Sequence, residues 1–298
     1  MNFDISVAIA TYNGSKFLEE QLNSILNQTI VPREIIMVDD CSTDNTIQII
    51  HEFQKKHTNI YLYVNDTNCG PIQTFKNAIL KCHYDFISLC DQDDIWELNK
   101  LQRCYEELLI INVVNKPCMV FSDLKMIDVF GNEMEPSFWD VQGYNPRKFN
   151  LKQLLIGNIV TGCSIMINRN MKEEILKMPV DKIMMHDHWI ALIAYSKGNF
   201  KIIYEKLIKY RIHQTSVTLK SKISFSQRLK LFSNVFFDSK REYLSNNISQ
   251  AESFYSIYNS QLSNDINEIF ENFIYLKNKN SLYRKFYVFL EKYLRYAK

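Results

Sequence analysis

Short apolar runs and polar breaks alternate along the first part of the chain. Four of the runs are typical of buried strands, and they cover residues 5–10, 34–38, 60–64 and 86–89. Between them, apolar residues recur every three or four positions, which predicts helices over about 15–26, 42–53 and 72–81. Ser15 would cap the first helix, and Ser42 or Asp44 the second. Alternating strands and helices with short connections predict an α/β fold with a mostly parallel sheet and helices on both faces.

The second half continues the pattern less regularly. Strands are predicted at 118–123 and 124–129, and a helical turn at 151–156. An amphipathic helix is predicted to begin at His186, and a final hairpin to consist of 202–204 and 207–210. The segment 136–150 is aromatic and irregular. It is either a surface loop held by packed aromatic rings or a flap over a binding site.

Beyond residue 217 the composition changes. Residues 218–226 are rich in Ser, Thr and Lys and are typical of a linker, and only helical spacing follows. We therefore expect two parts: a domain over 1–217 and a C-terminal helical region over 218–298. The last stretch carries an apolar stripe surrounded by Lys and Arg, and the stripe consists of Leu282, Phe286, Phe289, Tyr293 and Tyr296. Such a helix can pack on the first domain or a second subunit, or lie on an anionic membrane surface.

Composition narrows the classes of protein. The chain has 298 residues, 46% of them hydrophobic, which suffices for one sizeable core or a core with an appendage. The net charge of +2 does not predict a nucleic-acid partner. Seven scattered cysteines without a C-x-x-C pair predict neither a disulfide framework nor a zinc site, and they fit a reducing compartment. We see no signal peptide or membrane-spanning run and expect a cytoplasmic protein.

Three polar clusters come directly after predicted strands. They are Thr11-Tyr12-Asn13, Asp39-Asp40 and Asp91-Gln92-Asp93-Asp94. Parallel strands bring their carboxyl ends to one edge of the sheet, so these clusters should lie close together. The chain has no G-x-G-x-x-G and no P-loop motif, so a glycine-rich turn is not expected to hold phosphates.

The cluster at 91–94 holds three carboxylates in four positions. Because they repel one another, a divalent cation is a good reason to hold them together, and oxygen ligands suit Mg²⁺ or Mn²⁺. The alternative is a solvated acidic turn before the next helix. Taken together, the three clusters predict a nucleotide pocket, with a ring to stack on the base, a carboxylate to accept its N–H, and a metal for the diphosphate.

Three stretches in this order and spacing resemble the motifs of family 2 glycosyltransferases with the GT-A fold. They are residues 5–13, residues 38–44 and Asp91-Gln92-Asp93-Asp94-Ile95-Trp96, of which the last is similar to rhamnosyltransferase-like and surface-polysaccharide members. The resemblance covers about residues 3–215. It implies a Rossmann-like sheet and a metal-dependent, inverting transfer with Mn²⁺ or Mg²⁺. The donor would be a UDP- or dTDP-sugar, and the acceptor a hydroxyl of a surface glycan or lipid-linked oligosaccharide.

The resemblance also implies roles for individual residues. Ala10, Thr11, Tyr12 and Asn13 would hold the nucleobase and ribose, Asp40 would read the base, and Asn68 and Asn77 would lie near the donor. Asp93 would bind the metal, Asp91 the metal or ribose, and Gly162 would let the backbone approach the donor sugar. Asp187 would be the catalytic base. Arg211 would meet the diphosphate and His213 the metal.

Several alternatives remain open at this stage. His186, Asp187 and His188 could form a zinc triad, but the two histidines should point apart, and Asp187 could instead be a first-turn helix residue. Trp189 is expected in the core rather than in an acceptor site, and the resemblance gives Asp94 no clear role. A nucleotidyltransferase or phosphotransferase could use the same carboxylates. A non-catalytic nucleotide-sugar-binding subunit, a homo-oligomer through the C-terminal helices, and peripheral contact with the inner face of the cell membrane are further alternatives.

Overall fold

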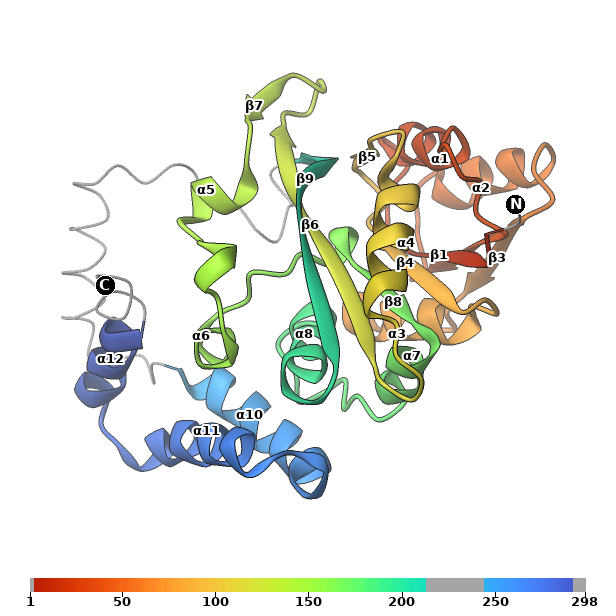
Figure 1. Cartoon of the computed structure of the whole chain (residues 1–298). Helices are drawn as coiled ribbons and strands as arrows, with labels where there is room; N and C mark the ends of the chain where they lie inside the picture. Colours follow the sequence, from red (N-terminus) through yellow and green to blue (C-terminus); the bar gives the residue numbers. More distant parts are fainter. Residues whose placement is uncertain (1–2, 213–243, 292–298) are drawn as a thin grey trace.

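The computed structural model describes residues 3–212 and 244–291 (Figure 1). Within this part of the chain, nine strands form one sheet in the order β3-β2-β1-β4-β8-β6-β9-β5, with β7 paired to β6. The strands are β1 (Ile5–Thr11), β2 (Glu34–Asp39), β3 (Ile60–Val64), β4 (Phe86–Cys90), β5 (Ile95–Trp96), β6 (Cys118–Ile127), β7 (Glu133–Glu135), β8 (Met166–Asn168) and β9 (Asn199–Arg211).

Helices α1 to α8 lie between the strands in sequence, and α10, α11 and α12 come after the last strand. They are α1 (Leu18–Leu26), α2 (Thr46–Gln54), α3 (Gly70–Lys81), α4 (Lys100–Ile111), α5 (Phe138–Gln142), α6 (Leu151–Ile156), α7 (Arg169–Ile175), α8 (His186–Lys197), α10 (Ser245–Tyr258), α11 (Asn264–Ile274) and α12 (Ser281–Phe289). None of the helices in the described ranges has the length and apolar character needed to span a bilayer.

The predicted fold class is confirmed. The four strands β3, β2, β1 and β4 are all parallel, as expected from strands joined by helical crossovers. The second half of the sheet is mixed, because β8 runs antiparallel to both β4 and β6, whereas β9 runs parallel to β6. The buried residues of β1, β2 and β4 form the centre of the hydrophobic core.

Two predicted details of the strands are wrong. Residues 118–127 form one strand, not two, and the predicted hairpin over 202–210 is a single long strand, β9, that pairs with β6. The polar residues Glu205 and Lys206 resemble a turn in the sequence. In the structure the register shifts at this point: Ser122 pairs with Ile203, and Asp123 pairs with Lys206. The extra residues of this bulge remain within the strand.

The predicted helix caps also differ. Helix α1 begins after Phe17 without a side-chain cap, and the N–H of Ser15 donates to Oδ2 of Asp44 at 3.0 Å. Ser42 bonds to Asp39 instead of capping α2. Oδ1 of Asp44 does accept from the N–H of Thr46, the first residue of α2, at 3.0 Å. These polar groups tie the loops after β1 and β2 together.

The prediction that α8 is amphipathic is wrong. Its residues from His188 to Ala194 are all buried, because α8 lies between the sheet and α10. Trp189 is fully buried and contacts the rings of Phe254 and Tyr258 in α10, which confirms its expected place in the core. The irregular segment 136–150 contains α5, whose Phe138 and Trp139 are buried, as the alternative of packed aromatic rings predicts.

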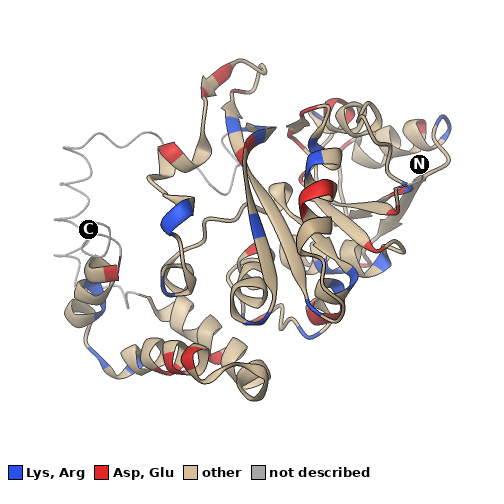
Figure 2. Ribbon diagram, viewed as in Figure 1, with Lys and Arg blue, Asp and Glu red and all other residues tan. Residues whose placement is uncertain are grey.

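The C-terminal helices share the core of the first domain. Phe254, Phe270 and Phe273 belong to the same buried cluster as the central strands. Asn247 in α10 donates to the carbonyl groups of Leu155 and Ile156 at the end of α6. The predicted linker at 218–226 and the boundary at 217/218 lie outside the described residues, as do Tyr293 and Tyr296. In the ribbon of Figure 2, positions of Lys and Arg and positions of Asp and Glu are mixed along the described part of the chain.

Candidate functional site

A cavity of about 1000 Å³ lies where β1, β2 and β4 end. The site residues predicted from the sequence that fall in the described ranges line this cavity, with the exception of Asn77; those that line it are Ala10, Thr11, Tyr12, Asn13, Asp40, Asn68, Asp91, Asp93, Gly162, Asp187 and Arg211. His213, the remaining predicted metal ligand, lies outside the described residues. These residues come from seven separate segments of the chain: the strand-end argument located the segments after β1, β2 and β4, and the family resemblance supplied the other four.

The loop after β1 is held by hydrogen bonds to the loop after β2. The N–H of Asn13 donates to Oγ of Ser42, and Oδ1 of Asn13 accepts from the N–H of Thr43, which keeps Asn13 at a positive φ of 48°. Asn is one of the few residues that tolerate this left-handed conformation. Tyr12 precedes it and is 49% exposed on the cavity wall. An aromatic ring is thus fixed in the open cavity by polar contacts to its neighbours.

Asp40 organises the loop that leads into α3. Its Oδ1 accepts from the N–H of Cys69 and from Nδ2 of Asn65, both at 2.9 Å, and its Oδ2 accepts from the N–H of Gly70 at 2.8 Å. Burial alone would raise the pKa of Asp40, but these hydrogen bonds outweigh it and lower the pKa. Asp40 is therefore an ionised carboxylate at neutral pH.

Two asparagines support this arrangement. Asn68 lines the cavity and donates from Nδ2 to the carbonyl oxygen of Asp40 at 3.1 Å. Asn77, also expected near the donor, donates to Oδ1 of Asn65 at 2.9 Å and so lies behind Asp40. The two residues thus reinforce the same loop from the cavity side and from the helix side.

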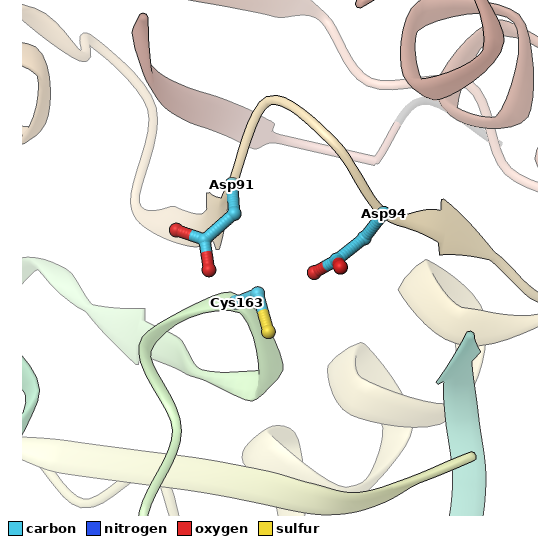
Figure 3. A group of neighbouring side chains, drawn as sticks. All are labelled: Asp91, Asp94 and Cys163. Carbon is cyan, nitrogen blue, oxygen red and sulfur yellow. The ribbon is translucent and has the colours of Figure 1, made fainter. Parts of the chain in front are cut away.

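The acidic cluster after β4 brings carboxylates together around a thiol. In Figure 3 the carboxyl group of Asp94 points toward the side on which Asp91 and Cys163 lie, whereas the carboxyl group of Asp91 points away from Asp94. One ligand atom from each of these three residues lies within 4.8 Å of the others. Asp93, the expected metal ligand, lines the cavity next to them. Carboxylate oxygens in this arrangement fit a hard divalent cation, while the thiol is a softer ligand than Mg²⁺ or Mn²⁺ prefers.

The carboxyl groups of this cluster have raised pKa values. Burial, followed by the charges of Asp93 and Asp187, raises the pKa of Asp91 to about 7. Burial and the charges of Asp93 and Asp91 also raise the pKa of Asp94 well above its usual value. Asp94 is fully buried, and its Oδ1 accepts from the N–H of Arg211 at 3.0 Å. Asp94 therefore anchors the end of β9, a role that the sequence did not reveal.

Asp187 lies in the first turn of α8 and is held by three donors. Oδ1 accepts from Nδ2 of Asn158 at 3.0 Å and from the N–H of His188 at 2.6 Å, and Oδ2 accepts from the N–H of Gly162 at 3.1 Å. Burial raises the pKa of Asp187 to about 7, although these hydrogen bonds oppose the shift. A carboxylate with such a pKa is suited to accept a proton near neutral pH.

The two histidines of this motif point to different partners. The ring of His186 stacks on Phe75 with 4.1 Å between centroids, and its two nitrogens have no hydrogen-bond partner in the described part of the chain. Nε2 of His188 faces the carbonyl oxygen of Leu154 at 2.7 Å, and its Nδ1 faces Nε2 of Gln250 at 3.0 Å. The expectation that the histidines point apart is thus met.

The structure gives a reason for glycine at position 162 that the sequence did not reveal. A Cβ atom at this position would lie 2.8 Å from Nε2 of His186, closer than real side chains approach. The missing side chain therefore makes room for the histidine ring, while the N–H of Gly162 holds Asp187.

Arg211 is almost fully buried and links several loops. Its Nε donates to the carbonyl oxygen of Asp93 at 2.8 Å, and its Nη2 pairs with Glu20 of α1. The guanidinium also lies 4.5 Å from the ring centroid of Phe17. Arg211 thus fixes the acidic loop, and contact with a diphosphate stays a prediction.

Sequence reasoning missed several residues at the site. Gln92 lies inside the acidic motif and was passed over because it carries no charge. Asn158 precedes the small-residue turn at 161–163, and only the fold brings it to Asp187. Lys100 is fully buried with Nζ 2.7 Å from Oγ of Ser88 and 3.5 Å from the Trp96 ring centroid. Its positive charge lowers the pKa of Asp91.

Comparison with known proteins identifies the family. Residues 6–174 match the model of the family described as Glycosyl transferase family 2. The dTDP-rhamnosyl transferase RfbG of Shigella flexneri is 38% identical over 109 residues, which cover 35% of this chain and 38% of the relative. The putative teichuronic acid biosynthesis glycosyltransferase TuaG of Bacillus subtilis is 23% identical over 215 residues, 72% of this chain and 81% of the relative.

Solved structures share the fold. TarS 1–349 of S. aureus, in complex with UDP, superimposes with a TM-score of 0.57 at 16% identity, over 99% of this chain and 92% of that one. The mannosyltransferase PcManGT of Pyrobaculum calidifontis, in complex with GDP-Man and Mn²⁺, superimposes with a TM-score of 0.52 at 17% identity, over 100% of this chain and 77% of that one.

The fold and the strand-end cavity define a glycosyltransferase of the GT-A type. Because the family match covers more than half of the sequence, the chain belongs to glycosyl transferase family 2. The resemblance to this family, and to its surface-polysaccharide members, is confirmed. The matched stretch spans 65% of the first of the curated relatives and 38% of RfbG.

Proposed function

We propose that this enzyme is a metal-dependent, inverting glycosyltransferase that uses a nucleoside diphosphate sugar. The observation that carries the proposal is the shared cavity, which brings Tyr12, Asp40, Asp91 and Asp187 together from four different elements. Tyr12 and Asp40 would bind the nucleoside at one part of the cavity, and the acidic cluster and Asp187 would carry out the transfer at another. A UDP- or dTDP-sugar would lie between them, since one relative is named as a dTDP-rhamnosyl transferase and one structural neighbour binds UDP.

Asp187 is the proposed catalytic base. Its carboxylate would take the proton from the acceptor hydroxyl as that oxygen attacks the anomeric carbon. Attack from the face opposite the departing diphosphate inverts this carbon. Two features support the assignment: the orientation of the carboxylate by Asn158 and Gly162, and a pKa raised by burial to about 7.

Asp93 and Asp91 are the proposed holders of the cation, Mn²⁺ or Mg²⁺. When bound, the cation would supply Lewis-acid stabilisation of the departing diphosphate. Burial is the main cause of the raised pKa of Asp91, and the charges of Asp93 and Asp187 add to it; a bound cation would offset both effects, which supports this assignment. Ala10, Thr11, Asn13 and Asn68 would surround the nucleoside. The predicted roles of Gly162 and Arg211 next to the donor are retained in this proposal.

The proposed acceptor is a growing surface glycan or its lipid-linked precursor, as the name of the TuaG relative suggests by analogy. A membrane-bound acceptor fits the exposed side of α12. Leu282 and Phe286 are 60% and 51% exposed, whereas Lys285 and Val288 form the buried side. Of the predicted apolar stripe, Phe289 is partly buried, and the exposed part in the described residues consists of Leu282 and Phe286. With Lys279 and Arg284 nearby in sequence, it suits an anionic bilayer surface at the inner face of the cell membrane.

The test is a thermal-shift panel of UDP-, dTDP- and GDP-sugars, each with and without Mn²⁺, followed by product analysis. A ligand that binds only the native state raises the melting temperature by mass action. We expect a metal-dependent increase for one nucleotide class and release of nucleoside diphosphate. Release of pyrophosphate would instead identify a nucleotidyltransferase, and binding without turnover a non-catalytic subunit.

A further inference from the structure

The carboxamide of Gln92 is paired with the main chain of Tyr12. Its Oε1 accepts from the N–H of Tyr12 at 2.9 Å, and its Nε2 donates to the carbonyl oxygen of Tyr12 at 3.0 Å. Gln92 belongs to the loop after β4, eighty residues away in sequence. The two polar groups of one side chain thus satisfy both main-chain groups of one residue in a different loop.

The sheet explains why Tyr12 needs such a partner. On the side of β2, strand β1 remains paired up to Thr11, opposite Asp39. On the side of β4, the last paired residue is Ile9, opposite Cys90. Beyond that pair, the main chain of β4 diverges into the acidic turn. The carboxamide of Gln92, which has the same donor and acceptor as a peptide group, pairs with Tyr12 beyond the last main-chain pair.

Gly14 provides the space for this contact. A Cβ atom on Gly14 would lie 2.2 Å from Oε1 and 2.5 Å from Cδ of Gln92. The φ of Gly14 lies outside the left-handed region, so its backbone does not itself require glycine. The glycine is therefore explained by the close approach of Gln92, and an alanine at this position would displace the carboxamide.

We propose that Gln92 is a positioning residue that fixes the Tyr12 ring for the nucleobase of a nucleoside diphosphate and ties this ring to the acidic loop. The inference rests on the proposed function, because it requires Tyr12 to stack on the base. Both polar atoms of the Gln92 carboxamide are engaged with the main chain of Tyr12, and this contact is the basis for assigning Gln92 a positioning role, although Gln92 also lines the cavity.

The experiment compares Gln92→Met with the wild-type chain. Methionine keeps the length of the side chain but removes both hydrogen bonds. Calorimetry would measure the affinity for UDP, dTDP or GDP with MnCl₂, using whichever binds tightest, and for pyrophosphate with MnCl₂, which has no base. Two hydrogen bonds of ordinary strength correspond to roughly tenfold in affinity. We expect Gln92→Met to bind the nucleotide about tenfold more weakly and pyrophosphate unchanged.

Three further variants complete the test. Gly14→Ala should reproduce the loss, and the double variant Gly14→Ala/Gln92→Met should lose no more than either single variant, because both act on one contact. Tyr12→Ala tests the stacking itself. Gln102→Met, on α4, removes hydrogen bonds to Thr29 and Glu106 away from the cavity and should leave both affinities unchanged.

The outcomes separate the inference from the function on which it rests. If Tyr12→Ala weakens nucleotide binding while Gln92→Met does not, the role of Gln92 is refuted and the nucleotide pocket stands. An equal loss of nucleotide and pyrophosphate affinity in Gln92→Met would also overturn it, because that result indicates a general distortion of the loop. If no nucleoside diphosphate binds the wild-type chain, the proposed function fails first.

Discussion

The side-chain amide of Asn158 donates a hydrogen bond to Oδ1 of Asp187 at 3.0 Å. Asn158 is itself fixed by Val160, whose carbonyl oxygen accepts from its Nδ2 and whose N–H donates to its Oδ1. Asp187 is thus oriented by a rigid neighbour that does not line the cavity. Asn158 is therefore placed to orient Asp187 if Asp187 is the base, as proposed.

The first prediction concerns this pair. Asn158→Ala should lower kcat roughly 10- to 100-fold, the usual cost of losing an orienting partner, and leave nucleotide affinity unchanged. Steady-state kinetics and calorimetry measure the two quantities. Asn59→Ala, which removes a hydrogen bond to the carbonyl oxygen of Pro32 far from Asp187, is the matched control. Wild-type turnover in Asn158→Ala would show that Asp187 needs no orienting partner.

The second prediction is the pH dependence of turnover. Burial raises the pKa of Asp187 to about 7, so the carboxyl is protonated below that pH and cannot act as a base. We expect kcat to rise about tenfold per pH unit below pH 7 and to level off above it. Asp187→Asn should bind the nucleotide but lose transfer by orders of magnitude. A flat profile between pH 5 and 8 in the wild type would contradict the assignment.

The same shift has a consequence for stability. Between the ordinary pKa of 3.8 and the raised value of about 7, the folded chain binds the Asp187 proton and the unfolded chain does not. This group therefore stabilises the fold less as pH rises through that window, and its effect is constant above it. Asp187→Asn removes the dependence, so its melting temperature should increase relative to the wild type between pH 4 and pH 7.

The sequence predicted those parts of the site that follow from the ends of strands. Tyr12, Asp40 and Asp91 were located because apolar runs end at polar residues and parallel strands align their ends. The long strand β9 was not predicted, since Glu205 and Lys206 look like a turn until the register shift with β6 is seen. Local pattern cannot distinguish a bulge from a hairpin when both expose polar residues.

Contacts between distant parts of the chain were also beyond sequence reasoning. Asn158 and Gln92 carry no charge, and the sequence indicates no partner for either side chain, so only the fold shows that they contact Asp187 and Tyr12. Helix α8 was predicted to be amphipathic from its apolar positions Ile190, Leu192, Ile193 and Tyr195. In the structure His188 is buried against α6 and α10, where the carbonyl of Leu154 and the side chain of Gln250 satisfy its ring nitrogens.

The third prediction concerns the carboxylates. Asp93→Asn should abolish metal-dependent donor turnover without unfolding the protein. Asp91→Asn should do the same and also raise the melting temperature of the metal-free protein, because it removes one of the mutually repelling charges. Asp66→Asn, an exposed substitution in the loop after β3, is the control for both. Unchanged turnover in Asp93→Asn would remove this residue from the proposed metal site.

The fourth prediction tests whether the C-terminal helices serve the active site. Gln250 of α10 accepts from the N–H of Met184 at 2.7 Å and faces Nδ1 of His188 at 3.0 Å, on either side of Asp187. Gln250→Met leaves the buried Nδ1 of His188 unpaired, at about 1–3 kcal/mol, and removes the acceptor of the N–H of Met184, a residue that is exposed to solvent. We expect a lower melting temperature and a lower kcat, with nucleotide affinity retained. Wild-type kcat in a correctly folded Gln250→Met would limit α10 to a packing role.

The fifth prediction addresses the exposed stripe of α12. The wild-type chain should sediment with vesicles of phosphatidylglycerol and phosphatidylcholine but not with phosphatidylcholine alone, and salt should weaken the binding because it screens the charges. Leu282→Glu and Phe286→Glu should reduce this binding, whereas Tyr61→Glu, an equally exposed aromatic position on β3, should not. If the two α12 variants instead convert a dimer to a monomer, and vesicles do not bind the wild type, the stripe is a subunit contact and the membrane proposal is wrong.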